Sequence, residues 1–334
     1  MRLVCFQRYR YRALGALHEQ RLVDLSAAAA AWLGVEQDDP FYEQEVALRL
    51  PADIREFLAG GAPSRSLAAA ALAFACRTPT PTGIDGEPLL VEMSDIRLLL
   101  PLKAPLILAA GARFNAGQDA EANERVAHRE FFMRNPLNVL GPSDMLHLPT
   151  GLGEDFDVAP RVAVVIGERL QRASHVQAQA AIHGFCAAMD VCARSLEKIS
   201  WAGPMFHLQY PHARSFDGAL ILGAAIVSRA DVDDPAHLWA RLSVDGNLVY
   251  DAPVPGRWDD LVSWIVELSE VVTLEPGTLL IPGSAEATVV QPAEPPLRPA
   301  QLSTDRSIPQ PRLSRGASVT LHVAGLDTIT TRID

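Results

Sequence analysis

The segment DVAPRVAVVIG, residues 157–167, decides the fold of this chain of 334 residues. Its second half, VAVVIG, is a short apolar run that is rich in branched side chains and ends at a glycine, which predicts a buried strand. Because successive side chains of a strand point to opposite faces, Ala159 and Arg161 share one face. The strand therefore presents a methyl group and a fixed positive charge side by side.

Other apolar runs extend this pattern along the chain. Residues 1–25 are typical of short strands joined by turns, and strands are also predicted at 106–112, 219–227, 238–251, 279–281 and 318–326. Helices are predicted at 27–33 with Ser26 as the cap, and at 53–59, 66–77, 176–185 and 258–270. The stretch TPTPTGIDG at 78–86 is typical of a linker. We therefore expect a small N-terminal α/β domain at 1–95 and a larger domain at 100–334.

Composition excludes several classes of protein. With 49% hydrophobic and 21% charged residues, the chain has enough apolar side chain to bury a core. Its 29 basic and 40 acidic residues give a net charge of −11, which disfavours nucleic acid and anionic membrane as partners. The four cysteines form no CxxC pair, and no apolar run is long enough to cross a bilayer. A cytoplasmic protein is expected.

A collinear series of short motifs covers most of the chain. The motifs are PLKAP at 101–105, FFMRNP at 131–136, LGPSD at 140–144, DVAPRVAVVIG at 157–167, MDVCARS at 189–195, ARSFD at 213–217, LEPG at 274–277 and PGS at 282–284. In this order they resemble the fumarylacetoacetate hydrolase (FAH) superfamily. The resemblance implies an α+β fold, with a mixed β-roll or β-sandwich core, assembled as a homodimer. It also implies chemistry on a 2-oxo acid or a 1,3-dicarbonyl compound.

The chain departs from this family at its metal site. Family members hold Mg²⁺ or Mn²⁺ with two glutamates on one strand and an aspartate on another. The two glutamate positions are Ala159 and Arg161 here, and only the aspartate, Asp190, is kept. One carboxylate is not a credible cage for a hard dication, so we expect no metal cofactor. Acidic residues at 154–157 are the candidates for replacement ligands if a metal is bound after all.

Arginine replaces other groups of the family's pocket. The pocket lysine corresponds to Arg214, and two further pocket positions carry Arg134 and Arg113. Because a guanidinium stays charged and fits a carboxylate or enolate, we hypothesise that these arginines and Arg161 bind a small anionic substrate in place of the metal. Ser284, at a threonine position of the family, is a candidate donor to a substrate carboxylate.

Proton transfer needs another set of side chains. The family's His–Glu pair falls on Gly117 and Ala120, so the candidates for moving protons are Asp190, Glu121 and Glu197.

Three hypotheses follow, and the first is favoured. The chain is a metal-independent FAH-family enzyme of hydrolase or lyase type, possibly placed in specialised biosynthesis. Alternatively, it is a non-catalytic binding or partner protein in which Arg161 and Asp190 form a buried ion pair. In the third hypothesis it is a conventional Mg²⁺-dependent hydrolase, decarboxylase or dehydratase. The proline-rich segment 291–311 is typical of a lid or a partner contact, and its role stays open.

Overall fold

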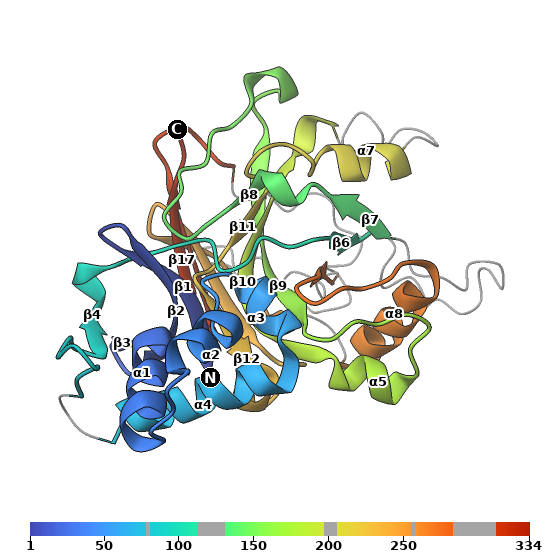
Figure 1. Cartoon of the computed structure of the whole chain (residues 1–334). Helices are drawn as coiled ribbons and strands as arrows, with labels where there is room; N and C mark the ends of the chain where they lie inside the picture. Colours follow the sequence, from blue (N-terminus) through green and yellow to red (C-terminus); the bar gives the residue numbers. More distant parts are fainter. Residues whose placement is uncertain (78–80, 112–130, 197–205, 255–257, 283–311) are drawn as a thin grey trace.

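The computed structural model describes residues 1–77, 81–111, 131–196, 206–254, 258–282 and 312–334 (Figure 1). The strands are β1 (Arg2–Arg8), β2 (Tyr11–His18), β3 (Arg21–Asp24), β4 (Leu90–Glu92), β5 (Arg97–Leu98), β6 (Ile107–Ala110), β7 (Phe131–Arg134), β8 (Val139–Leu140), β9 (Phe156–Ile166), β10 (Ile182–Ala193), β11 (Leu220–Leu222), β12 (Ala225–Ser228), β13 (Trp239–Val244), β14 (Asn247–Pro253), β15 (Leu279–Ile281), β16 (Ser318–Val323) and β17 (Thr328–Arg332). The helices are α1 (Leu25–Ala31), α2 (Tyr42–Arg49), α3 (Ile54–Ala59), α4 (Gly61–Ala75), α5 (His175–Ala180), α7 (Phe206–His212) and α8 (Trp258–Val271).

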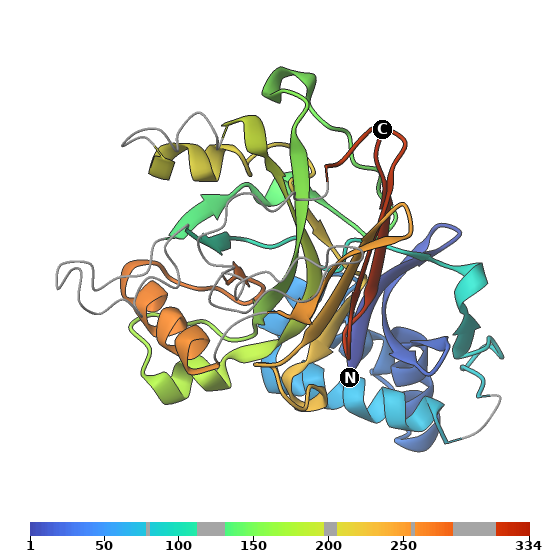
Figure 2. The same cartoon turned by 180° about the vertical axis from the view of Figure 1, so that it is seen from behind.

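A long antiparallel pair, β9 and β10, forms the centre of the fold. Among the described residues, thirteen strands make one sheet whose main path is β4-β3-β2-β1-β12-β10-β9-β15-β6-β7. This sheet is mixed, because β15 runs parallel to β6 and β11 runs parallel to β8. A second sheet has the order β14-β13-β16-β17 (orange and red in Figure 2). The expected α+β class is confirmed.

Each face of the β9–β10 pair is covered by an apolar core. Ala163 and Ala188 belong to one core, which also holds residues of α1, α3 and α4. Val164 and Met189 belong to the other core, which includes the four-stranded sheet and α8. Helices α5 and α8 pack side by side at the edge of this second core (Figure 1 and Figure 2). This alternation is the period of two that a strand buried on both faces must have.

The N-terminal strands join the large sheet directly. Strand β1 pairs with β12, so that Arg2, Leu3 and Val4 face Val227, Ile226 and Ala225 across an antiparallel ladder. The first strands of the chain therefore share hydrogen bonds and a core with the later ones. The division into domains at 1–95 and 100–334 stays a prediction. None of the described helices has the length and apolar character needed to cross a lipid bilayer.

Three local predictions differ from the structure. The helix predicted at 176–185 ends at Ala180, and β10 begins at Ile182, because the apolar pattern of this segment also fits a strand. The strand predicted at 219–227 is two strands, β11 and β12, separated at residues 223–224. Asp24 rather than Ser26 caps α1, since its carboxylate accepts hydrogen bonds from two backbone N–H groups of the first turn.

Glycine at position 184 is required by the approach of two backbones. A Cβ atom there would lie 2.1 Å from the carbonyl oxygen of Val227 on β12. We expect Gly184→Ala to destabilise the protein by about 1–3 kcal/mol, because the neighbouring strand has to shift. Chemical denaturation measures this change. Gly151→Ala is the matched control, since a Cβ at Gly151 meets no atom within 4 Å; equal stability of the two variants would contradict the prediction.

Candidate functional site

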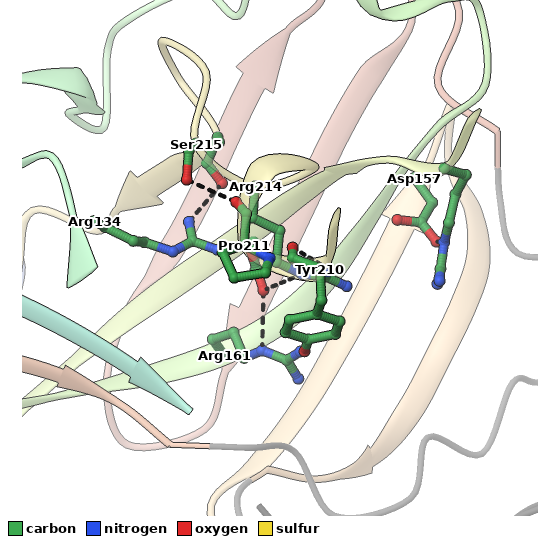
Figure 3. A network of polar contacts seen from close by, with 10 residues as sticks. Arg134, Asp157, Arg161, Tyr210, Pro211, Arg214 and Ser215 are labelled. Carbon is green, nitrogen blue, oxygen red and sulfur yellow. Dashed lines mark hydrogen bonds and ion pairs between the residues drawn. The ribbon is translucent and has the colours of Figure 1, made fainter. Parts of the chain in front are cut away.

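Four elements bring charged side chains together at one end of the β9–β10 pair. Asp190 lies on β10, directly opposite Ala159 of β9 in the ladder, and Arg161 follows two residues later on the same strand. Arg134 is the last residue of β7, and Arg214 follows α7. Figure 3 shows the side chains of Arg134, Arg161 and Arg214 converging on one region. Three of the four arginines predicted to bind an anion are therefore neighbours.

Asp190 is the shared partner of these three arginines. Arg134 donates a hydrogen bond from Nη2 to Oδ1 of Asp190. The Nε atoms of Arg161 and Arg214 each lie 3.5 Å from Oδ2 of the same carboxylate. Both oxygens of Asp190 thus face guanidinium groups, and the carboxylate holds the cluster together.

The three arginines differ in their remaining contacts. Arg134 also donates from Nη1 to the carbonyl oxygen of Ala219, at 3.2 Å. Arg214 donates from Nη1 to the carbonyl oxygen of Tyr210 at 3.2 Å, and its guanidinium lies 3.8 Å from the centroid of the Tyr210 ring. Arg161 contacts Asp190 through Nε, and its Nη1, like Nε of Arg134, is buried without a hydrogen-bond partner among the described residues. Protein groups therefore fix two of the guanidiniums more firmly than the third.

The charged side chains of the cluster are buried, so their charges are poorly compensated by water. Arg161 is 8% exposed and Asp190 is 4% exposed, and Arg134 and Arg214 are equally buried. Three guanidiniums face one carboxylate, so these four side chains carry two positive charges in excess. An excess charge away from water is costly unless a counter-charge is bound. The arrangement is suited to receiving an anion.

The same arginines set the ionisation of Asp190. Burial by itself raises the pKa of this carboxyl, but Arg134, Arg214 and Arg161 outweigh that effect and hold the pKa below its ordinary value. Asp190 is consequently a carboxylate at neutral pH. A low pKa also makes it a weak base.

The residues present do not fit the divalent ion that the resemblance to the FAH superfamily implies. Position 159 has a methyl group, position 161 has a cation, and the oxygens of Asp190 already face arginines. Within the described ranges, no three His, Cys, Asp or Glu side chains are grouped as metal ligands would be. Asp157, one of the alternative ligands, forms an ion pair with the half-buried Arg194 and lies apart from the arginine cluster in Figure 3.

Four other residues and one segment are predicted for the site. Arg113, Glu121, Glu197 and Ser284, and the proline-rich segment 291–311, lie outside the described residues. Sequence reasoning did not identify Tyr210 as part of the site, although it stands four residues before Arg214, a spacing that brings side chains together on a helix. The hydrogen bond from Arg134 to the backbone carbonyl of Ala219 could not be predicted, because every residue has such a carbonyl.

The fold and site define a member of the fumarylacetoacetate hydrolase family. The family model described as fumarylacetoacetate (FAA) hydrolase C-terminal matches residues 109–334, and the chain belongs to this family. Oxaloacetate tautomerase Fahd2a, mitochondrial, from Rattus norvegicus is 28% identical over 240 residues, which cover 70% of this chain and 69% of that protein. Oxaloacetate tautomerase YisK from Bacillus subtilis is 24% identical over 200 residues, 58% of this chain and 63% of that protein.

Solved structures confirm the FAH-type fold over the whole chain. A fumarylacetoacetate hydrolase from the psychrophile Exiguobacterium antarcticum has a TM-score of 0.66 and 17% identity, and covers 100% of this chain and 99% of its own. Maleylpyruvate hydrolase from Sphingobium sp. SYK-6 has a TM-score of 0.63 and 18% identity with the same coverage. At these identities the likeness concerns the fold alone.

Proposed function

We propose that this protein is an FAH-family enzyme that binds the anion of a 2-oxo acid or 1,3-dicarbonyl compound and moves protons between its keto and enol forms. Guanidinium groups supply the positive charge that a divalent ion supplies in the family. The observation that carries the proposal is the buried cluster of Arg134, Arg161 and Arg214 around the single carboxylate of Asp190. The names of the curated relatives, which are oxaloacetate tautomerases, support this reaction type.

The chemistry of enolisation matches what such a cluster offers. A base removes a proton from the carbon next to the carbonyl, negative charge develops on the carbonyl oxygen, and an acid then protonates that oxygen. Fixed N–H donors directed at the developing charge lower the barrier, because they need no reorganisation during the reaction. Arginine keeps its charge throughout, and its planar fork fits both carboxylate and enolate oxygens.

The arginine cluster does not supply the base that removes the proton from carbon. Asp190 is a weak base because three arginines lower its pKa, and Asp157 is paired with Arg194. Glu121 and Glu197 therefore remain the predicted proton carriers. In this proposal Asp190 positions the arginines, and the described residues bind the anion and stabilise its charge.

Oxaloacetate in its enol form absorbs in the near ultraviolet, which allows a direct test. We expect the wild-type protein to speed keto–enol equilibration of oxaloacetate in the presence of EDTA. Arg161→Gln should lower kcat/KM by about 10²–10³, the usual effect of losing one donor to a developing oxyanion. Arg241→Gln, which changes an exposed arginine paired with Asp251, is the control. Activity that EDTA abolishes and Mn²⁺ restores would instead support the metal-dependent hypothesis.

A non-catalytic binding protein is the second candidate. The weak basicity of Asp190 favours it, because a cluster without a base binds an anion and does no more. Stabilisation of the protein by small carboxylates, together with no acceleration of equilibration, would identify this function. A homodimer, a cytoplasmic location and a role in specialised biosynthesis stay predictions.

A further inference from the structure

Two aromatic side chains connect the elements that bring two of the arginines to the site. Phe132 lies on β7, two residues before Arg134. Tyr210 lies on α7, four residues before Arg214. Resting on the proposed function, we propose that this aromatic pair is a positioning device, which fixes β7 and α7 relative to each other so that both arginines face Asp190. The two rings act on a substrate only through the arginines.

Each ring contacts the arginine of its own element. Phe132 and Arg134 point to the same face of β7, and the guanidinium lies 5.5 Å from the centroid of the Phe132 ring. The guanidinium of Arg214 lies 3.8 Å from the centroid of the Tyr210 ring. A guanidinium within about 6 Å of a ring centroid is attracted by the negative face of the ring, and more strongly where water is excluded. Both arginines are buried, so the rings restrict where their charges lie.

The two rings also contact each other. The ring centroids of Phe132 and Tyr210 are 5.9 Å apart, and the ring planes meet at 86°. This edge-to-face geometry is favourable for aromatic pairs beyond the area that they bury. A continuous series of contacts therefore runs from Arg134 through both rings to Arg214, and it joins a strand to a helix from a distant part of the chain.

The relative position of β7 and α7 matters because their arginines approach different oxygens of one carboxylate. Arg134 donates to Oδ1 of Asp190, whereas Nε of Arg214 lies 3.5 Å from Oδ2. A shift of α7 against β7 would move one guanidinium away from the carboxylate. Donors lower the barrier of a reaction only when they are already directed at the developing charge. An aliphatic side chain could fill the same space, but it would not attract a guanidinium to a defined face.

The Nε–Hε signals of the arginines in NMR spectra of the ¹⁵N-labelled protein test this positioning without any turnover. The Arg214 signal is the one that Arg214→Lys removes, and we expect the ring of Tyr210 to shift it upfield. Tyr210→Leu should abolish that shift. Phe132→Leu should also move the Arg214 signal by more than repeat spectra differ, because Tyr210 loses its support. Phe74→Leu is the matched control, since it removes a half-buried ring from α4 that lies 4.9 Å from the guanidinium of Arg77, and it should leave the signal in place.

Keto–enol equilibration of oxaloacetate in EDTA gives the functional readout. Tyr210→Leu is expected to lower kcat/KM by about tenfold, the effect of losing a cation–π contact away from water. Phe132→Leu should lower it by about threefold, in keeping with the loss of an edge-to-face pair. Tyr210→Phe keeps the ring and should stay near the wild-type value. Because the rings act as a unit, the double leucine variant should lose no more activity than Tyr210→Leu alone.

The outcomes separate this inference from the proposed reaction. An Arg214 signal that stays in place in Phe132→Leu would overturn the positioning role, whether or not oxaloacetate is turned over. Wild-type activity in Tyr210→Leu would overturn it as well. Tyr210→Phe decides if a leucine variant does not fold, because a loss of activity there would assign the role to the hydroxyl instead of the ring. An Arg214 signal that responds to both leucine variants in a protein that does not speed equilibration would overturn the reaction and support the positioning role.

Discussion

Asp190→Asn is expected to destabilise the folded protein by about 3–5 kcal/mol at neutral pH, the usual effect of removing one partner from a buried ion pair. Asp190 is 4% exposed, and its carboxylate faces the buried guanidiniums of Arg134, Arg161 and Arg214. Asparagine keeps the shape and some hydrogen bonding but removes the negative charge that all three buried guanidiniums face. Urea denaturation at pH 7 measures the loss.

Two comparisons make this expectation specific. Asp234→Asn removes an exposed carboxylate paired with His237, and exposed pairs of this kind contribute about 0–1 kcal/mol. The double variant Asp190→Asn with Arg161→Gln should be less destabilised than the sum of its single variants, because it removes one of the uncompensated charges. If Asp190→Asn lowered the free energy of unfolding as little as Asp234→Asn does, the carboxylate of Asp190 would not be needed to balance the charge of the arginines.

The same carboxylate gives a defined pH dependence. The arginines hold the pKa of Asp190 below its ordinary value in the folded state. In the unfolded chain the pKa of an aspartate is about 3.9. The stabilisation is therefore fully present above about pH 4 and is lost as the pH falls further, through the folded-state pKa. The difference in stability between wild type and Asp190→Asn should be constant from pH 5 to 8 and shrink below pH 4. A difference that shrank near pH 7 would mean that another group carries the effect.

Local patterns predicted the elements of the fold better than their boundaries. The apolar run at 162–167 correctly indicated a buried strand, because branched apolar side chains are favoured there. The apolar pattern at 182–185 predicts a helix where the structure has a strand, since Ile182 and Phe185 fit either period. Only the pairing of β10 with β9 and β12 decides between the two.

In the site, too, contacts within one strand were predictable from the sequence, and contacts between distant segments were not. Strand period alone places Ala159 and Arg161 on one face, and the ladder then sets them beside Asp190. The contact between Arg134 and Asp190 could be expected only through the family resemblance, because the two residues are 56 positions apart and β7 is held in place by β6. The stacking of Arg214 on Tyr210 also depends on the path of the chain after α7, which their spacing of four residues does not fix by itself.

Replacing both Ala159 and Arg161 with glutamate is expected to create a divalent-metal site around Asp190. The two new carboxylates lie two residues apart on one face of β9, beside Asp190, and supply hard oxygen ligands. The change takes the cluster from two positive charges in excess to one negative charge, which removes the electrostatic barrier to a dication. We expect 1 mM Mn²⁺ to raise the melting temperature of the double variant and EDTA to reverse the effect. Binding at a hundredfold excess over Kd would stabilise the fold by about 2.7 kcal/mol.

The neutral variant Ala159→Gln with Arg161→Gln separates charge from shape, because it has side chains of the same length without carboxylates. It should not respond to Mn²⁺, and neither should the wild type. The glutamate variant should also lose any stabilisation by small carboxylates, since a cluster that attracts a cation repels an anion. Stabilisation of the wild type by Mn²⁺ would mean that carboxylates elsewhere in the chain complete a metal site around Asp190. The absence of a response in the glutamate variant would mean that Arg134 and Arg214 suffice to keep cations away, so that the preference for anions does not depend on position 161 alone.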